Sequence, residues 1–258
     1  MTASPRGKRL VLRVKGTDSL AQIPIRFFLF PGGNIMNRIK LRDRKLPNYS
    51  IGEEQMNMVT HIVGGGIGVL VLVLCVIKAA LKGSVWGVVT GAVYGGTMIA
   101  LYAVSSIYHG LKPNMGKKVM QVVDHCTIYF LIAGTYTPIV VCGLRPVYPL
   151  LGWGMLIFEW VLAIVACVLT AIDLKKYNVF SMACYIGTGW AIIPFAKQAL
   201  HALTVPGFSL VLAGGIAYTI GAVLYGIGSK VKWMHSVFHI FVVLGSLLQA
   251  LAIIFYVM

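Results

Sequence analysis

Long apolar stretches dominate the chain from Met56 onward. Seven of them are close to the ~20 residues that an α-helix needs to cross a bilayer. Short breaks that are polar or contain Pro and Gly separate them, so the pattern predicts an all-α integral membrane fold with seven transmembrane helices. The predicted spans are Met56–Leu81, Val85–His109, Val119–Cys142, Tyr148–Ile172, Asn178–Ala199, Gly207–Gly228 and Met234–Val257.

The composition narrows the class of protein further. Of the 258 residues, 58% are hydrophobic and only 11% are charged, whereas about a quarter of the residues in a soluble domain are charged. A water-soluble enzyme is therefore excluded. We expect two regions: a basic cytoplasmic tail over residues 1–48, either disordered or lying on the membrane surface, and a membrane domain over residues 49–258.

The positive charge is distributed unevenly. The formal net charge is +15, and 11 of the 22 Lys and Arg residues lie in the first 50 positions. With the tail inside, basic residues split 18 to 4 in favour of the cytoplasmic side, as the positive-inside rule requires. The N-terminus is thus predicted inside and the C-terminus outside, in the cell membrane. We expect the tail to bind anionic lipid headgroups rather than nucleic acid.

Small residues and cysteines add little chemistry. Gly64 with Gly68, and Gly91 with Gly95, have the spacing that lets membrane helices approach closely. Close packing within one chain is the favoured interpretation, and a homodimer face is the alternative. All five cysteines lie in apolar segments without a paired motif, which argues against disulfides and zinc-thiolate sites. Pro138 and Pro194 are expected to kink their helices.

Ionisable and polar side chains gather at one end of the predicted bundle. The alternating direction of the spans brings the end of span two and the starts of spans one, three and seven to the same depth, beneath the cytoplasmic surface. Ionisable groups inside a membrane are costly and are candidates for function. The residues concerned are Glu53, Asn57, His61, Ser105, His109, Asp124, His235 and His239.

The histidines at this depth have the spacing of metal ligands. His235 and His239 are four residues apart, so they share one helix face. With His109 they would provide three imidazoles and leave a fourth coordination position open, which is typical of catalytic zinc sites. Nitrogen ligands favour zinc or a similar transition metal over magnesium or calcium.

Several neighbouring residues have more than one interpretation. Asp124 could hold a water molecule, orient a ligand histidine or act as general base. Ser105 either acts near the site or bonds its own helix backbone. His61 is a supporting residue, an alternative ligand or a partner of Glu53. His125 points away from Asp124 on the helix and is interpreted as a non-ligand, and His201 as a loop residue on the far side.

At these residues the chain resembles the progestin and adiponectin receptor family, and within it the bacterial hemolysin III branch. The resemblance runs from Tyr49 to the end of the chain and implies a seven-helix fold with zinc at His109, His235 and His239, beside Asp124 and Ser105. Two features differ from that branch: the long basic tail, and Gln249 where the branch has a histidine. The matching segments are Glu53-x3-Asn57-x3-His61, Ser105–His109, Asp124-His125, Ile132–Pro138 and His235-x3-His239.

Three functions follow as hypotheses. The first is a zinc-dependent hydrolase of a lipid amide or ester bond at the cytoplasmic side, resembling the ceramidases of the family. The second is a non-enzymatic receptor or regulator of lipid homeostasis with structural zinc. The third, a cytolysin, is disfavoured because we find no secretion signal and because polarity is confined to one side of the bundle.

Overall fold

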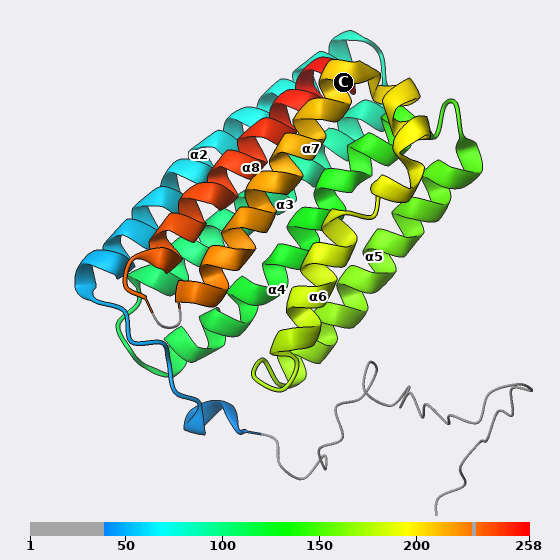
Figure 1. Ribbon diagram of the computed structural model, residues 1–258. Helices are drawn as coiled ribbons and strands as arrows, with labels where there is room; N and C mark the ends of the chain where they lie inside the picture. Colours follow the sequence, from blue (N-terminus) through cyan, green and yellow to red (C-terminus); the bar gives the residue numbers. More distant parts are fainter. Residues whose placement is uncertain (1–38, 229–230) are drawn as a thin grey trace, which may run out of the picture. The chain divides into compact units, whose positions relative to one another are not determined.

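The computed structural model describes residues 39–228 and 231–258, and all the regular secondary structure in those ranges is helical (Figure 1). Most of the predicted tail therefore lies outside the described residues. The elements are η2 (Leu41–Asp43), α2 (Ile51–Leu81), α3 (Val85–Gly110), α4 (Met115–Pro138), the π-helix η3 (Ile139–Leu144), α5 (Pro149–Ile172), α6 (Asn178–Gly189), η4 (Ile193–Phe195), α7 (Ala196–Gly228) and α8 (Met234–Tyr256).

Among the described residues, six stretches are long and apolar enough to cross a membrane. This identifies a multi-pass membrane protein. Five of the stretches correspond to predicted spans one to four and seven. The sixth runs from Asn178 to Gly228 and contains the predicted spans five and six together.

The prediction of one continuous helix over Asn178–Ala199 is wrong. Helix α6 ends at Gly189, the short η4 follows, and α7 begins at Ala196. Pro194 fits the break, because its nitrogen has no N–H to donate to the carbonyl four residues earlier, at Trp190. The predicted break at Thr204–Pro206 appears as a kink inside α7, where Thr204 has φ of 64°.

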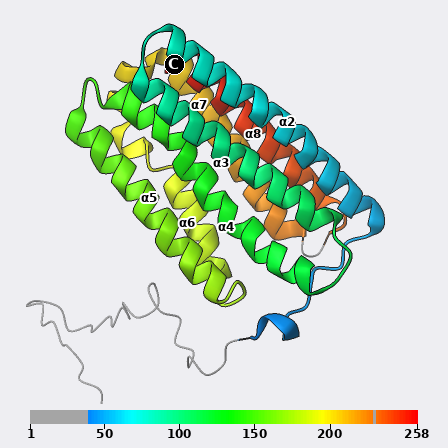
Figure 2. The same ribbon diagram turned by 180° about the vertical axis from the view of Figure 1, so that it is seen from behind.

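The helix starts follow from local capping. The side chain of Ser50 accepts a hydrogen bond from the Glu53 backbone, and Glu53 bonds back to Ser50, forming a capping box that begins α2 before the apolar run. Ser84 and Asn114 are simple N-caps of α3 and α4, since their side chains accept hydrogen bonds from the backbones of Gly87 and Lys117. Helices α2, α4 and α8 begin at one end of the bundle (Figures 1 and 2), which we call the proximal end.

Helices α2 and α3 make the most extensive contact, and glycine allows it. An added Cβ at Gly64 would lie 2.6 Å from the Tyr102 ring, and one at Gly95 would lie 2.6 Å from the backbone of Leu72. Gly68 and Gly91 also face the neighbouring helix of the same chain. The close-packing interpretation of these glycines is therefore confirmed, while a homodimer stays a prediction.

Large apolar side chains cover the outside of the bundle. Leu70, Leu74, Phe158 and Val161 are among those exposed on α2 and α5. Such a surface suits a surrounding of lipid tails, where only helices with satisfied backbones are stable. Inside, α3 provides the buried Tyr94, Met98 and Tyr102, and the five cysteines are free thiols. Buried polar side chains within this bundle therefore differ clearly from their apolar surroundings.

Candidate metal centre and apolar cavity

Three histidines from two helices meet at the proximal end. His109 lies in the last turn of α3, and His235 and His239 lie in the first two turns of α8. One ring nitrogen of each lies within 4.8 Å of the others, and all three residues are buried. The Nε2 atoms of His235 and His239 are 3.1 Å apart. We refer to these residues as the histidine trio, and they could hold a metal ion.

The hydrogen bonds of the trio suit such an ion. Nδ1 of His109 lies 2.7 Å from Oε2 of Glu54 and donates a hydrogen bond to it, so in the neutral imidazole Nε2 carries a lone pair. That Nε2 is buried and has no hydrogen-bond partner among the described residues. A buried acceptor without a partner is costly, and a metal cation would use it. The donor set of three imidazoles is compatible with zinc.

Glu54 contacts the trio, whereas the predicted Glu53 does not. The carboxylate of Glu53 accepts hydrogen bonds from the backbone of Trp233 at 2.7 Å and from Ser50. It therefore ties the start of α2 to the start of α8 and is no partner for His61. Glu54 escaped the sequence analysis, although Glu54, Asn57 and His61 also have helical spacing and share one face of α2.

Asn57 and His61 both lie against the trio, as the spacing on α2 predicts. The amide nitrogen of Asn57 is 3.4 Å from Nδ1 of His109. The ring of His61 stacks on His239 with centroids 3.8 Å apart, and both of its nitrogens are buried without a hydrogen-bond partner among the described residues. His61 is thus a neighbour of the trio rather than one of its three members.

Asp124 and Ser105 lie beside the trio. Ser105 is fully buried on α3, one turn before His109, and its side chain interacts with the carboxyl group of Asp124 on α4. Both residues line the same cavity as His61, His235 and His239. The structure therefore brings together every predicted site residue except Glu53.

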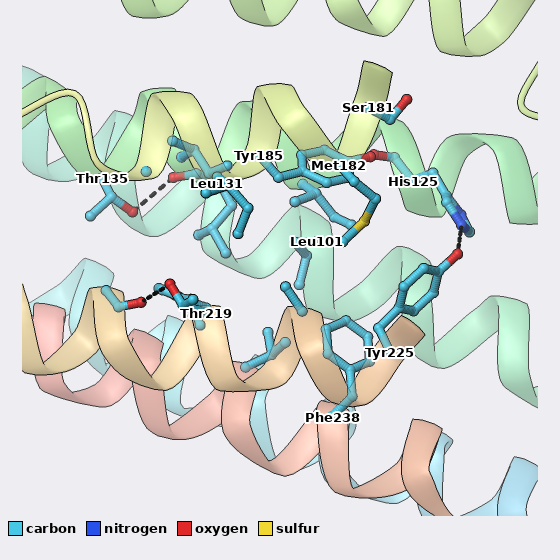
Figure 3. A pocket seen from close by; sticks show the side chains of 18 of the residues that line it. Leu101, His125, Leu131, Thr135, Ser181, Met182, Tyr185, Thr219, Tyr225 and Phe238 are labelled. Carbon is cyan, nitrogen blue, oxygen red and sulfur yellow. Dashed lines mark hydrogen bonds between the residues drawn. The ribbon is translucent and has the colours of Figure 1, made fainter. Parts of the chain in front are cut away.

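The remaining histidines lie elsewhere. Nδ1 of His125 bonds the carbonyl of Gln121 at 2.8 Å, and its Nε2 accepts a hydrogen bond from the Tyr225 hydroxyl at 3.3 Å (Figure 3). His125 is thus outside the trio, in agreement with its interpretation as a non-ligand. His201 is exposed and pairs with the hydroxyl of Tyr148, but it lies within helix α7, so its interpretation as a loop residue is wrong.

Tyr49 covers the trio from outside the membrane-spanning helices. Its ring stacks on His235 with centroids 4.8 Å apart and an interplanar angle of 20°. Burial is the main cause that raises the pKa of the Tyr49 phenol, with smaller contributions from Tyr225 and Glu54, so the ring stays neutral at physiological pH. The sequence offered no signal for this contact, because Tyr49 precedes the first helix.

An apolar cavity of about 140 Å³ extends from the trio into the bundle. Its walls come from α3, α4, α6, α7 and α8 (Figure 3), where Leu101, Leu131 and Met182 face the interior. His239 and Gln249 both line it and lie ten residues apart on α8, which corresponds to about 15 Å of helix. The histidine trio thus sits at one end of an elongated apolar space at membrane depth.

Comparisons with known proteins assign the family. Residues 49–250 match the family model described as haemolysin-III related, so the chain belongs to that family. It is 36% identical over 208 residues to "Hemolysin-3" of Bacillus cereus, covering 81% of this chain and 93% of that one. The figures for the "Hemolysin-3 homolog" of Bacillus subtilis (strain 168) are 35% over 208 residues, with 81% and 96% covered.

A human protein extends the relationship beyond bacteria. The chain is 26% identical over 180 residues to the "Monocyte to macrophage differentiation factor" of Homo sapiens, covering 67% of this chain and 72% of that one. Together with the bacterial relatives, this match confirms the resemblance to the progestin and adiponectin receptor family and its hemolysin III branch.

Proposed function

We propose that the protein is a zinc-dependent hydrolase of a lipid amide or ester bond, acting at the cytoplasmic side of the bilayer. The observation that carries the proposal is the position of the histidine trio, whose ligand atoms lie within 4.8 Å of one another and whose members His235 and His239 line an apolar cavity. The cavity suits a hydrocarbon chain, and the trio suits a metal beside a polar bond. A lipid that enters from the bilayer would place its hydrocarbon chain in the cavity and its polar bond beside the metal.

The chain's own residues supply proton transfer and orientation. Zinc, when bound, provides a Lewis acid that polarises a carbonyl group and makes water a stronger nucleophile near pH 7. Asp124 is assigned the role of general base, which accepts the proton that the attacking water loses and returns it to the leaving group. The Ser105 side chain, which interacts with Asp124, holds that carboxylate in place.

The proposed topology has seven crossings with the N-terminus in the cytoplasm. The stretch from Asn178 to Gly228 has 51 residues, which as one helix would be about 77 Å long, more than twice the ~30 Å hydrocarbon core. The break after Gly189 supports two crossings there. The 18 to 4 division of basic residues supports the orientation, and the basic tail is proposed to bind anionic lipid headgroups.

Metal analysis and lipid hydrolysis test the function together. Purified wild-type protein is expected to contain about one zinc per chain and to cleave a long-chain N-acyl amide or acyl ester in mixed micelles. H235A should lose most of the metal and of the turnover, because it removes one of three ligands. H201A, which changes an exposed histidine of α7, is the matched control and should keep both.

Two results would contradict the proposal: wild-type protein purified without bound metal, or H235A protein with unchanged turnover.

A non-enzymatic receptor or lipid regulator is the second candidate. It is favoured by one observation, namely that the trio joins α3 to α8, so a bound metal would also clamp two helices. In this case a chelator should lower the melting temperature of the bundle while no lipid product forms with any substrate. Cytolysis is not proposed, because the cavity that leads from the histidine trio is apolar and, among the described residues, offers no polar path across the bundle.

A further inference from the structure

We propose that Glu54 is a positioning residue for the metal centre and that Lys117 holds Glu54 in place. This inference rests on the zinc site of the proposed function but does not depend on catalysis. Glu54 belongs to the first turn of α2, His109 to the last turn of α3 and Lys117 to the first turn of α4. The three side chains therefore connect three helices at the proximal end.

The contacts form a continuous chain of charge-assisted hydrogen bonds. Oε2 of Glu54 accepts the proton on Nδ1 of His109 at 2.7 Å, and its Oε1 accepts a hydrogen bond from the Lys117 ammonium group at 2.6 Å. Lys117 also donates to the backbone carbonyl of Leu111 at 2.9 Å. The Lys117 side chain is 4% exposed and that of Glu54 is 19% exposed, so solvent screens the pair only weakly.

The Glu54 carboxylate determines which ring nitrogen of His109 carries the lone pair that faces His235 and His239. With the proton on Nδ1 bound to Glu54, the buried Nε2 is available as a ligand. In the other tautomer an N–H group would point towards His235 and His239 and would compete with a metal. A carboxylate behind a ligand histidine also increases the basicity of the ligand, and such partners typically account for 10–100-fold in metal affinity.

Lys117 balances the charge of Glu54, because a partly buried carboxylate without a counter-charge is costly. The ammonium group balances Glu54, and its bond to Leu111 anchors it at the connection between α3 and α4. Lysine is rarely buried unless it is paired, and Lys117 is 3% exposed as a residue. The Lys117–Glu54 pair thus aims one carboxylate oxygen at His109.

Adjacent residues provide matched controls for both members of the pair. Glu53 has the same side chain as Glu54 but bonds Trp233 and Ser50, and Lys118 follows Lys117 without contacting Glu54. The experiment measures the zinc dissociation constant of the purified full-length protein in detergent by competition with a chelator. The variants are E54A, E54Q, K117M, E53Q and K118M, and melting temperatures are recorded for each.

We expect E54A to bind zinc about 10–100-fold more weakly than wild type. E54Q should also weaken binding, because its amide has one acceptor oxygen for the two donors that Glu54 serves, Nδ1 of His109 and the Lys117 ammonium group, and K117M should lie between wild type and E54A. E53Q and K118M should stay within about twofold of wild type. Nitrogen NMR of histidine-labelled, metal-free protein should show the Nδ1–H tautomer at His109 in wild type and its loss in E54A.

The failures of the two proposals are distinguishable. Wild-type protein that binds no zinc would overturn the proposed function and this role with it. Zinc binding in wild type with equally tight binding in E54A, or an equal weakening in E53Q, would overturn the positioning role alone. A lower melting temperature of E54A with an unchanged dissociation constant would show that the pair only joins helices, and this too would overturn the role.

Discussion

At the scale of single residues, the hydrogen bonds around each histidine distinguish a candidate metal ligand from a histidine with another role. His125 has both ring nitrogens in hydrogen bonds, to Gln121 and Tyr225, and His201 is exposed beside Tyr148. His109, by contrast, has one nitrogen bonded to Glu54 and the other buried without a partner among the described residues. That combination of one fixed and one available nitrogen is what a metal ligand requires.

A second property of single residues is the fit of Gly64 against α3. We expect Gly64→Ala to destabilise the protein by about 1–3 kcal/mol, which is the usual cost of overpacking a filled site. The new Cβ would lie 2.6 Å from the Tyr102 ring. Tyr102 cannot easily move away, because its hydroxyl donates to Ser246 at 2.7 Å. Thermal unfolding in detergent measures the effect.

Gly66 is the matched control, because an added Cβ there would meet nothing within 4 Å. Gly66→Ala should leave stability unchanged or raise it by up to about 1 kcal/mol, since alanine favours the helix. If both variants melted at the wild-type temperature, close packing at Gly64 would not be a constraint.

The sequence predicted the trio but not its supporting carboxylate. The shared face of His235 and His239 follows from helix periodicity, and the shared depth of His109 follows from the alternating direction of the predicted spans. The choice between Glu53 and Glu54 does not, because one residue turns a side chain by about 100°. That choice depends on how the chain enters α2, where the capping box of Ser50 and Glu53 uses the first of the two glutamates.

At the scale of elements, the break between α6 and α7 determines the shape of one bundle wall. Helix α6 has 12 residues, about 18 Å, so it ends at membrane depth. Backbone groups exposed there would be costly unless the protein satisfies them. The hydroxyl of Tyr136 does so twice, because it donates to the Gly189 carbonyl at 3.0 Å and accepts from the Ile192 backbone at 3.2 Å.

Removing this hydroxyl tests its importance. We expect Tyr136→Phe to cost about 1–3 kcal/mol of stability, because a buried N–H and a buried carbonyl would each lose a partner. Tyr256→Phe is the control, since Tyr256 is 40% exposed at the end of α8, and it should melt like wild type. Equal melting temperatures for the two variants would mean that other groups satisfy the break.

The sequence predicted this region only in part. Pro194 was expected to bend a helix, but the helix ends five residues earlier, at Gly189. The hydroxyl of Tyr136 satisfies the backbone groups at this helix end, and Tyr136 lies 53 positions away from Gly189 in the sequence. Periodicity describes contacts within a helix, so a partner on another helix cannot be derived from it.

At the scale of the whole molecule, the number of crossings determines on which side each loop lies. In a topology with seven crossings, three crossings lie between Val147 and Lys232, namely those through α5, α6 and α7. If Asn178–Gly228 crossed only once, two crossings would separate these residues and both would lie on the same side. A labelling experiment therefore tests the count and the orientation together.

In a cysteine-free background, we expect V147C to react with a membrane-impermeant maleimide in intact cells. K232C should react only after the cells are permeabilised, because its loop is proposed to be cytoplasmic. Cysteines that react in the same compartment would contradict seven crossings, and a reversed pattern would contradict the orientation.

The distribution of the trio between α3 and α8 has a consequence for biogenesis. The ribosome delivers His109 to the membrane well before His235 and His239, with the four helices α4, α5, α6 and α7 made in between. No partial set of helices up to α7 contains the complete ligand group. The metal proposed for this site can therefore reach its full coordination only after α8 has been inserted, so its loading would belong to the last stage of assembly.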